Sequence, residues 1–246
     1  MKKVYKTQGI ILKTLRYGEA DNILTIFSLD EGKIGAIAKG ARKTKSKLGP
    51  RLENFTEAEL VLYRGRNLST VTQAETIKTY RSLREDYSKF LYASCMCDFV
   101  SKVIQDGQSE ERIYTLLKDG LSALANNNAN YELILLSFDW KLLGLLGFNP
   151  TLKKCSCAQC LNKELSVFSI EEGGLICPKN VTDRMLNRKL TLFSIGALKS
   201  IIDDDIEKAA ELTVDNDTLK QLDSLTQDYI LCQLQTSIRS KDFLVR

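Results

Sequence analysis

Four cysteines close together in the sequence have the side-chain type and spacing of metal ligands. Three of them lie within residues 155–160. The fourth ends the segment 168–177, which has the pattern of a hairpin and would return the chain to the other three. A Cys-x-x-Cys turn lets two thiolates bind one Zn²⁺. A second Cys-x-x-Cys turn that starts at Cys177 would need a cysteine at position 180, where the sequence has Asn180. We therefore expect the first cysteine of the cluster to supply the fourth ligand. The predicted ligands of a structural Zn²⁺ are Cys155, Cys157, Cys160 and Cys177. A three-cysteine site and a loop without zinc are the alternatives.

A long run of positive charge without any acidic residue lies between Glu31 and Glu53. Its centre, residues 39–47, is small, polar and rich in lysine, which predicts a flexible loop between two strands. Cations on such a loop, together with accessible backbone N–H groups, bind phosphate groups of nucleic acids. A merely solvated turn is the alternative. We expect a neighbouring hairpin to extend this patch, so that the predicted nucleic-acid contacts are Lys39, Arg42, Lys43, Lys45, Lys47, Arg51, Arg64 and Arg66.

The composition excludes several classes of enzyme. The chain has 0 histidines, so it cannot build a Ser-His-Asp triad, a Cys-His pair, an HExxH site or a Cys2His2 finger. It has no GxxxxGK[ST] sequence, which excludes a P-loop nucleotide site. Three consecutive aspartates at 203–205 favour a solvated acidic turn over a carboxylate metal site. Because no catalytic constellation is present, we expect a protein that is not an enzyme.

The N-terminal residues 1–80 are predicted to form five short strands. β-branched residues concentrate in runs that are separated by turn-forming residues, at 7–15, 23–29, 33–38, 56–63 and 68–78. Five strands with hairpin spacing fit a small OB-type Greek-key barrel, and an SH3-like barrel is the alternative. Some aromatic residues of this part could stack on bases, although a place in the barrel core or at its rim is the other interpretation. These residues are Tyr5, Tyr17, Phe27, Phe55 and Tyr63.

From Ser82 onward the spacing of apolar residues becomes helical. Helices are predicted at 82–105, from Ser109 to about Ala125, at 131–146, and near 194–203 and 217–238. The segment 131–146 is apolar nearly all round and should be buried. We therefore expect an α+β multidomain protein. Its predicted parts are an OB-fold nucleic-acid-binding domain (1–80), two parts of an all-α domain (81–149 and 182–246) and a zinc-binding insertion (150–181).

The charge of the chain is distributed unevenly between these parts. Residues 1–80 hold 15 Lys and Arg against 8 Asp and Glu, whereas the remaining 166 hold 20 against 23. This asymmetry predicts that the two parts have different partners. No run approaches the roughly 18 apolar residues of a membrane-spanning helix, and the first residues lack the hydrophobic core of a signal peptide. We therefore expect a cytoplasmic protein.

Several motifs of the chain resemble those of the RecO family of bacterial recombination mediators. Along the chain, the cysteine cluster and the segment 168–177 come after the motifs given below, in the same order as in the family. The resemblance covers the chain to about residue 180, whereas the remaining residues match only in helical character. The motifs are GIILKT at 9–14, YGEAD at 17–21, GAIAKGAR at 35–42, ENFT at 53–56, YRGR at 63–66 and LLGLLGFNP at 142–150.

The resemblance implies an N-terminal OB fold, a helical C-terminal domain and a zinc-binding insertion. It implies a nucleoid-associated mediator of DNA repair and recombination that binds single- and double-stranded DNA and anneals complementary strands. It also implies the RecFOR pathway, with loading of RecA onto DNA coated by single-strand-binding protein (SSB) and with RecR as partner. The cysteine spacing departs from the two Cys-x-x-Cys turns usual in the family. An RNA-binding OB protein and a metal-dependent nuclease are the alternative functions.

An SSB partner would be recognised through the acidic, hydrophobic-tipped tail that the resemblance implies for it. Such a tail needs an apolar groove with a cation at its edge. We expect this groove along the helices of residues 83–125. The candidate cations are Arg84, Lys89, Lys102, Arg112 and Lys118.

Overall fold

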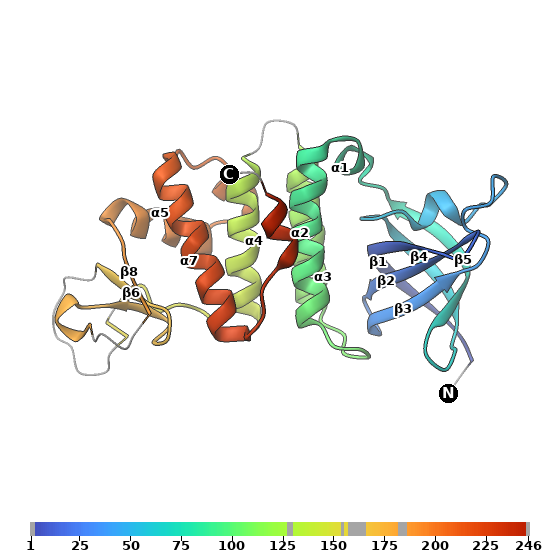
Figure 1. Cartoon of the computed structure of the whole chain (residues 1–246), viewed down its shortest axis with the longest axis horizontal. Helices are drawn as coiled ribbons and strands as arrows, with labels where there is room; N and C mark the ends of the chain where they lie inside the picture. The colour runs from blue at the N-terminus through green and yellow to red at the C-terminus, as the bar shows by residue number, and fades with distance from the viewer. Residues whose placement is uncertain (1–2, 127–129, 154, 157–165, 182–185, 245–246) are drawn as a thin grey trace. The chain divides into compact units, whose positions relative to one another are not determined.

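The N-terminal strands close into a five-stranded barrel in the computed structural model, which describes residues 3–126, 130–153, 155–156, 166–181 and 186–244 (Figure 1). The strands are β1 (Val4–Tyr17), β2 (Asp21–Ser28), β3 (Gly32–Ala38), β4 (Glu57–Tyr63) and β5 (Ser69–Lys78). Their order is β1-β2-β3-β5-β4, and β1 pairs with β4 to complete the closure. All pairs are antiparallel except β3 with β5. The five predicted strands are confirmed, and the arrangement is OB-like.

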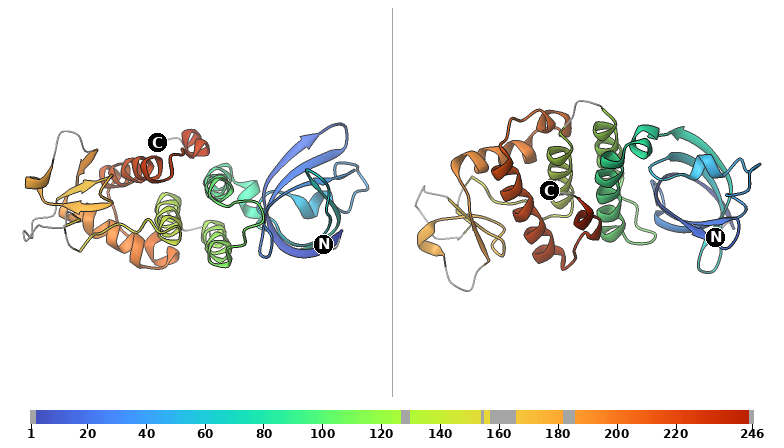
Figure 2. Two further views of the ribbon diagram at one scale, coloured as in Figure 1. Left: turned by 90° about the horizontal axis from the view of Figure 1, so that it is seen from below. Right: turned by 45° about the horizontal axis from the view of Figure 1, so that its top comes forward.

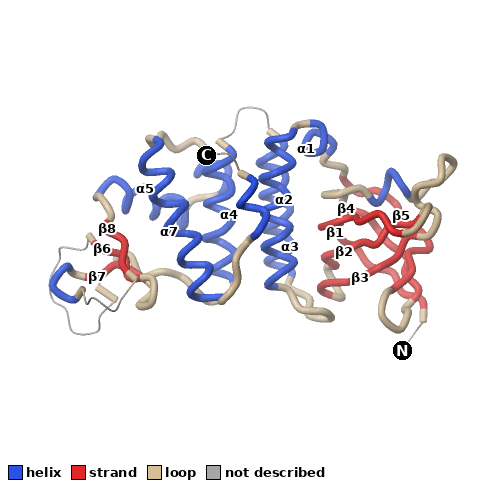
Figure 3. Tube along the Cα trace, in the orientation of Figure 1, coloured by secondary structure: helices blue, strands red, loops and turns tan. Residues whose placement is uncertain are grey.

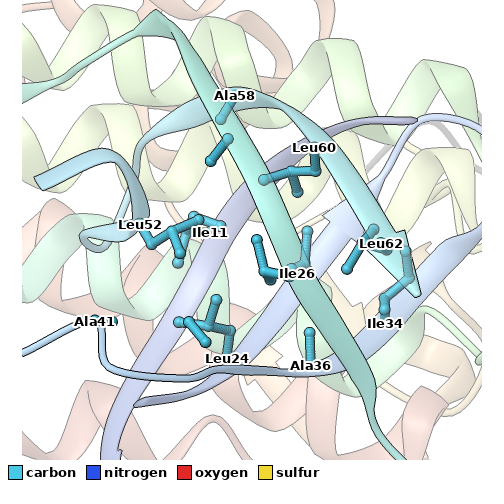
Figure 4. Close-up of a cluster of buried hydrophobic side chains, with 13 residues drawn as sticks. Ile11, Leu24, Ile26, Ile34, Ala36, Ala41, Leu52, Ala58, Leu60 and Leu62 are labelled. Carbon is cyan, nitrogen blue, oxygen red and sulfur yellow. The ribbon is translucent and has the colours of Figure 1, made fainter. Parts of the chain in front are cut away.

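Alternating side chains of these strands fill the barrel. Leu24 and Ile26 of β2 point inward beside Ile34 of β3 and Leu60 of β4, and all four are buried (Figure 4). Alternation of this kind is what a strand with one buried face requires. β1 carries a register shift between Ile11 and Lys13, and such a bulge bends a long strand so that it can pair on both sides.

Three helices and a returning segment complete the first compact unit, which comprises residues 1–125 and 238–246. The helices are α1 (Arg81–Glu85), α2 (Tyr87–Val103) and α3 (Glu111–Ala125). The prediction of one helix over 82–105 is wrong, because Asp86 is extended and its side chain caps α2 by accepting from the backbone N–H of Lys89. The short 3-10 helix η3 (Arg239–Phe243) folds back onto α2, where Ser240 donates to the Asp98 carboxylate.

The second compact unit, residues 126–237, is built around α4 (Tyr131–Leu145). The predicted burial of this helix is confirmed, and its Trp140 stacks on Tyr229 with ring centroids 5.0 Å apart. The other helices are α5 (Leu192–Asp203), α6 (Ile206–Ala210) and α7 (Asn216–Leu234). A small sheet contains β6 (Val167–Ser169), β7 (Gly174–Ile176) and β8 (Asn187–Lys189), with a 3-10 helix η2 (Pro178–Asn180) after β7 (Figure 3). Within the described parts of the chain, no helix has the length and apolar character needed to cross a membrane.

Candidate nucleic-acid interface

The basic loop between β3 and β4 has a folded backbone rather than an extended one. Successive turns carry it away from the barrel: Lys43 donates its backbone N–H to the carbonyl of Gly40 (3.1 Å) and Ser46 to that of Lys43 (2.8 Å). The 3-10 helix η1 (Gly49–Leu52) then brings the chain back, and the buried Leu52 enters the barrel core. The loop is therefore anchored by an apolar side chain at the end of the barrel.

The turn between β1 and β2 holds the start of the same loop. The backbone N–H of Arg42 donates to the carbonyl of Ala20 (2.9 Å), and its guanidinium donates to the carbonyl of Gly18 (2.6 Å). The Asp21 carboxylate accepts from the backbone N–H of Gly40 (2.7 Å), which has a positive φ of 65°. Glycine adopts this conformation without strain. These contacts fix the loop and the β1–β2 turn to one another at one end of the barrel.

The predicted cations of this loop are all exposed, and the fold brings them to the same end of the barrel. They are Lys39, Arg42, Lys43, Lys45, Lys47 and Arg51. Of these, Arg51 also donates to the carbonyl of Ala74 on β5 (2.7 Å), which holds its guanidinium against the barrel wall. Exposed ammonium and guanidinium groups on an anchored backbone can neutralise phosphate charges without reading bases.

The β4–β5 hairpin does not extend this patch, so that part of the prediction is wrong. Arg64 donates its backbone N–H to Lys3 at the start of β1 and its guanidinium to Glu31 in the β2–β3 turn (2.8 Å). These contacts place the hairpin, including the exposed Arg66, at the opposite end of the barrel from the β1–β2 turn (Figures 1 and 2). The physical reason is strand direction, because in this antiparallel pairing the β1–β2 and β4–β5 turns emerge at opposite ends.

Two cations that the sequence interpretation missed lie beside the basic loop. Lys13 and Arg16 are exposed on the second half of β1 and pair with Thr25 and Asn22 of β2, next to the β1–β2 turn. They were missed because a search for runs of charge does not detect cations that are separated along a strand. The signal in the sequence that could have identified them is the presence of Lys and Arg at positions near the end of the first predicted strand.

The aromatic residues divide into core and surface groups. Phe27 and Phe55 are buried, with Phe27 against Tyr114 and Phe55 against Phe90 (ring centroids 5.5 and 5.4 Å apart), so they cannot stack on bases. Tyr17 is 55% exposed at the β1–β2 turn, on the same end of the barrel as the basic loop. Tyr63 is exposed at the other end of the barrel, and Tyr5 lies under the Arg64 guanidinium there (4.5 Å to the ring centroid).

The cysteine region is described only in part. The predicted hairpin is confirmed as β6 and β7, and Cys177, just beyond it, is buried. Ser156 donates its backbone N–H to Leu175 (2.9 Å), which brings the neighbouring Cys155 to the β7 edge two residues before Cys177. Cys157 and Cys160 lie outside the described residues. Among the side chains that are described, no three potential ligands gather into a metal site.

Most of the candidate cations on the helices are already engaged in contacts within the first unit. Lys89 is buried and its ammonium donates to the carbonyl of Ala125 (3.1 Å). The prediction that it is a cation at the edge of a groove is therefore wrong. Arg112 is exposed in the first turn of α3. The remaining candidates form the ion pairs Arg84–Glu53 (3.0 Å), Lys102–Asp98 (3.6 Å) and Lys118–Glu57 (2.9 Å).

Comparison with known proteins agrees with the architecture described above. The family descriptions "Recombination protein O N terminal" and "Recombination protein O C terminal" match residues 1–80 and 84–242. The DNA repair protein RecO of Alkaliphilus metalliredigens is 34% identical over 230 residues, 93% of each chain. That of Caldanaerobacter subterraneus subsp. tengcongensis is 33% identical over 247 residues, which covers 98% of this chain and 97% of its own length. That of Rubrobacter xylanophilus is 38% identical over 175 residues, which covers 71% of this chain and 70% of its own length. The chain therefore belongs to the RecO family.

Proposed function

We propose that this chain is a non-enzymatic mediator of DNA repair and recombination that binds single- and double-stranded DNA through the loop end of its barrel. The observation that carries the proposal is the set of six exposed cations on a loop anchored by Leu52 and by hydrogen bonds to Gly18 and Ala20. Lys13 and Arg16 enlarge that positive surface. Phosphate contacts position a strand without selecting its sequence, which is what a general repair factor requires.

Annealing of complementary strands follows from the same surface. Two strands repel one another through their phosphates, so a protein that accelerates pairing must neutralise both while the bases stay accessible. Cations on an exposed loop meet this requirement better than a deep pocket that reads bases. We propose that annealing serves the loading of RecA onto DNA coated by SSB, with RecR as partner. The names of the curated relatives, DNA repair protein RecO, support a role in DNA repair. For the acidic SSB tail we propose Arg112 as the receiving cation, since it is exposed.

A competition titration separates this function from its two rivals. A labelled single-stranded DNA is bound to the full chain at one salt concentration and displaced with unlabelled single strand, duplex or RNA of matched sequence. We expect single-stranded DNA and duplex to compete and RNA to compete no better than DNA. Displacement by RNA at much lower concentration would support the RNA-binding alternative. Degradation of the labelled DNA on addition of Mg²⁺ or Mn²⁺ would instead support a nuclease.

For the cysteine cluster we propose one structural Zn²⁺ held by Cys155, Cys157, Cys160 and Cys177. The proposal is supported by the backbone contacts of Thr151 and Ser156 with β7, which bring the first cysteine of the cluster to the strand that leads to Cys177. Four thiolates form a closed tetrahedral zinc site without an open position for chemistry. Such a site contributes to folding, because the ligands are not organised in the unfolded chain.

The zinc proposal is tested by substituting one ligand and one unrelated cysteine. Cys157→Ser is expected to lower both the zinc content and the midpoint of thermal unfolding, because three thiolates bind Zn²⁺ less tightly than four. Cys232→Ser serves as the control, since Cys232 is exposed on α7 away from the cluster in sequence, and it should leave both quantities unchanged. Elemental analysis of untagged protein purified without chelator measures the metal. Absence of zinc in the parent protein would contradict the proposal.

A further inference from the structure

Two large apolar side chains are exposed next to one another at the start of α5. Leu192 is 84% exposed and Phe193 is 53% exposed, although the helix they begin is well capped: Thr191 accepts from the backbone N–H of Ser194 (3.0 Å). The first turn of α5 is therefore held in a defined place by its cap, and its apolar side chains face solvent. Adjacent exposed apolar groups of this size often mark a surface that another molecule covers.

A hollow of about 480 Å³ lies between the first turns of α5 and α7, and Phe193 forms part of its wall. Two of its polar lining side chains, Ser194 and Gln221, already form hydrogen bonds within the protein. The hydroxyl of the buried Ser194 donates to the Gln221 side-chain oxygen (2.6 Å), and the Gln221 amide donates to the carbonyl of Lys189 (2.9 Å). An occupant of the hollow would consequently meet the Phe193 ring and two polar side chains that are already hydrogen-bonded to one another. The remaining lining residues are Thr191, Asp215, Asp217 and Thr218.

The rim of this hollow is negatively charged. The Asp215 carboxylate accepts from the backbone N–H and the hydroxyl of Thr218 (2.9 and 3.0 Å), and these bonds hold its pKa below the ordinary value, so it is ionised at neutral pH. Asp217 is exposed in the first turn of α7. The carboxylates of Asp215 and Asp217, which line the hollow, repel phosphate groups and attract cations.

We propose that this hollow docks a partner protein through a basic segment in which an apolar side chain lies beside Lys or Arg. The apolar side chain would pack on Phe193 and Leu192, and the cation would face the carboxylates of Asp215 and Asp217. Charge complementarity selects this occupant over DNA, because the negative rim disfavours a polyanion. Apolar anchors next to complementary charge are the usual means by which short segments are recognised. The site is distinct from the proposed DNA surface, which lies on the other compact unit.

The test uses the full chain and two short peptides, acetyl-Gly-Lys-Leu-Phe-Lys-Gly-amide and its counterpart with Glu in place of both Lys. Methyl NMR of the chain is recorded during titration with each peptide. We expect the basic peptide to shift the methyl resonances of Thr191, Leu192 and Thr218 with saturation, and the acidic peptide to leave them unchanged. Phe193→Ser and Asp217→Lys should each weaken binding of the basic peptide by about fivefold, the size of effect that one modest contact or exposed charge contributes.

Matched variants separate docking from general electrostatics. Leu231→Ser removes a 55%-exposed apolar side chain from α7, and Glu132→Lys reverses a carboxylate in the first turn of α4, as Asp217→Lys does in α7. Both controls should bind the basic peptide as the parent does. If Phe193→Ser fails to fold, Leu192→Ser, at a still more exposed position, replaces it. Equal shifts with both peptides, shifts confined to other residues, or unchanged affinity in the hollow variants would overturn the proposal.

Discussion

Replacing Arg42, Lys43, Lys45 and Lys47 together by Ala is expected to slow the annealing of complementary oligonucleotides and to weaken DNA binding. Each phosphate contact releases counterions, so the log–log dependence of affinity on salt should flatten by up to about 3.6 for duplex and about 2.8 for single strands. All four side chains are exposed, and little loss of stability is expected from the three lysines. Fluorescence annealing assays and binding titrations at several salt concentrations measure both effects.

A smaller variant separates loss of charge from loss of loop anchoring. The Arg42 guanidinium donates to the Gly18 carbonyl, so its removal also loosens the contact between the loop and the β1–β2 turn. A triple substitution of Lys43, Lys45 and Lys47 keeps that hydrogen bond and should flatten the duplex slope by up to about 2.7. The charge-matched control replaces four exposed lysines of the second unit, Lys179, Lys189, Lys208 and Lys220. If the quadruple loop variant anneals DNA as fast as this control and keeps the salt dependence of the parent protein, DNA binds at another surface.

Lys118→Met is expected to lower the free energy of unfolding by about 3 kcal/mol, a large effect for a single substitution. Glu57, at the start of β4, is 1% exposed, and its carboxylate accepts from Lys118 (2.9 Å), Gln8 (2.7 Å) and Tyr114 (3.2 Å). Burial raises the pKa of Tyr114, so its hydroxyl keeps the proton that it donates to Glu57. Without Lys118 the buried carboxylate would keep the hydrogen bonds from Gln8 and Tyr114 but would lose its counter-ion. The expected loss is at the lower end for a broken buried pair, because the lysine side chain is partly exposed.

Urea denaturation with a double-mutant cycle tests this expectation. Glu57→Gln combined with Lys118→Met removes both charges and should recover part of the lost stability, since no uncompensated charge remains. Lys6→Met is the matched control: Lys6 pairs with Glu59 at 2.7 Å on the barrel surface, where both side chains are exposed. Its loss should cost much less than that of Lys118, because water and salt screen an exposed ion pair. Equal costs for Lys118→Met and Lys6→Met would mean that the Glu57 carboxylate reaches water in the native protein.

The local elements of this fold could largely be predicted from the sequence, whereas their spatial relations could not. Period-2 alternation identified β4, and the apolar pattern around the whole circumference identified the buried α4. The break at Asp86 escaped prediction because the apolar stripe continues across it, so only the cap geometry reveals two helices. β8 and α6 are too short for periodicity to be detectable.

The cations of the candidate interface could be predicted where they lie close together in the sequence. They could not be predicted where the order and direction of the strands determine which of them lie side by side. The concentration of positive charge between Lys39 and Arg51 is apparent from the sequence alone. That Arg64 lies at the other end of the barrel depends on the direction in which β4 and β5 emerge, and that Lys13 lies beside the basic loop depends on the pairing of β1 with β2. The burial of Lys89 depends on the packing of α2 against α3, and its contact with the Ala125 carbonyl has no counterpart in the local sequence.

The return of residues 238–243 to α2 makes the first unit discontinuous along the chain. During synthesis, the barrel and α1–α3 emerge early, yet the contact between Ser240 and Asp98 must wait until the whole of the second unit has been translated. The second unit is consequently held at both of its ends, and it is topologically an insert rather than an appended module. A nonsense mutation just after residue 237 would leave the second unit's own residues intact and would remove the last piece of the unit that was made first.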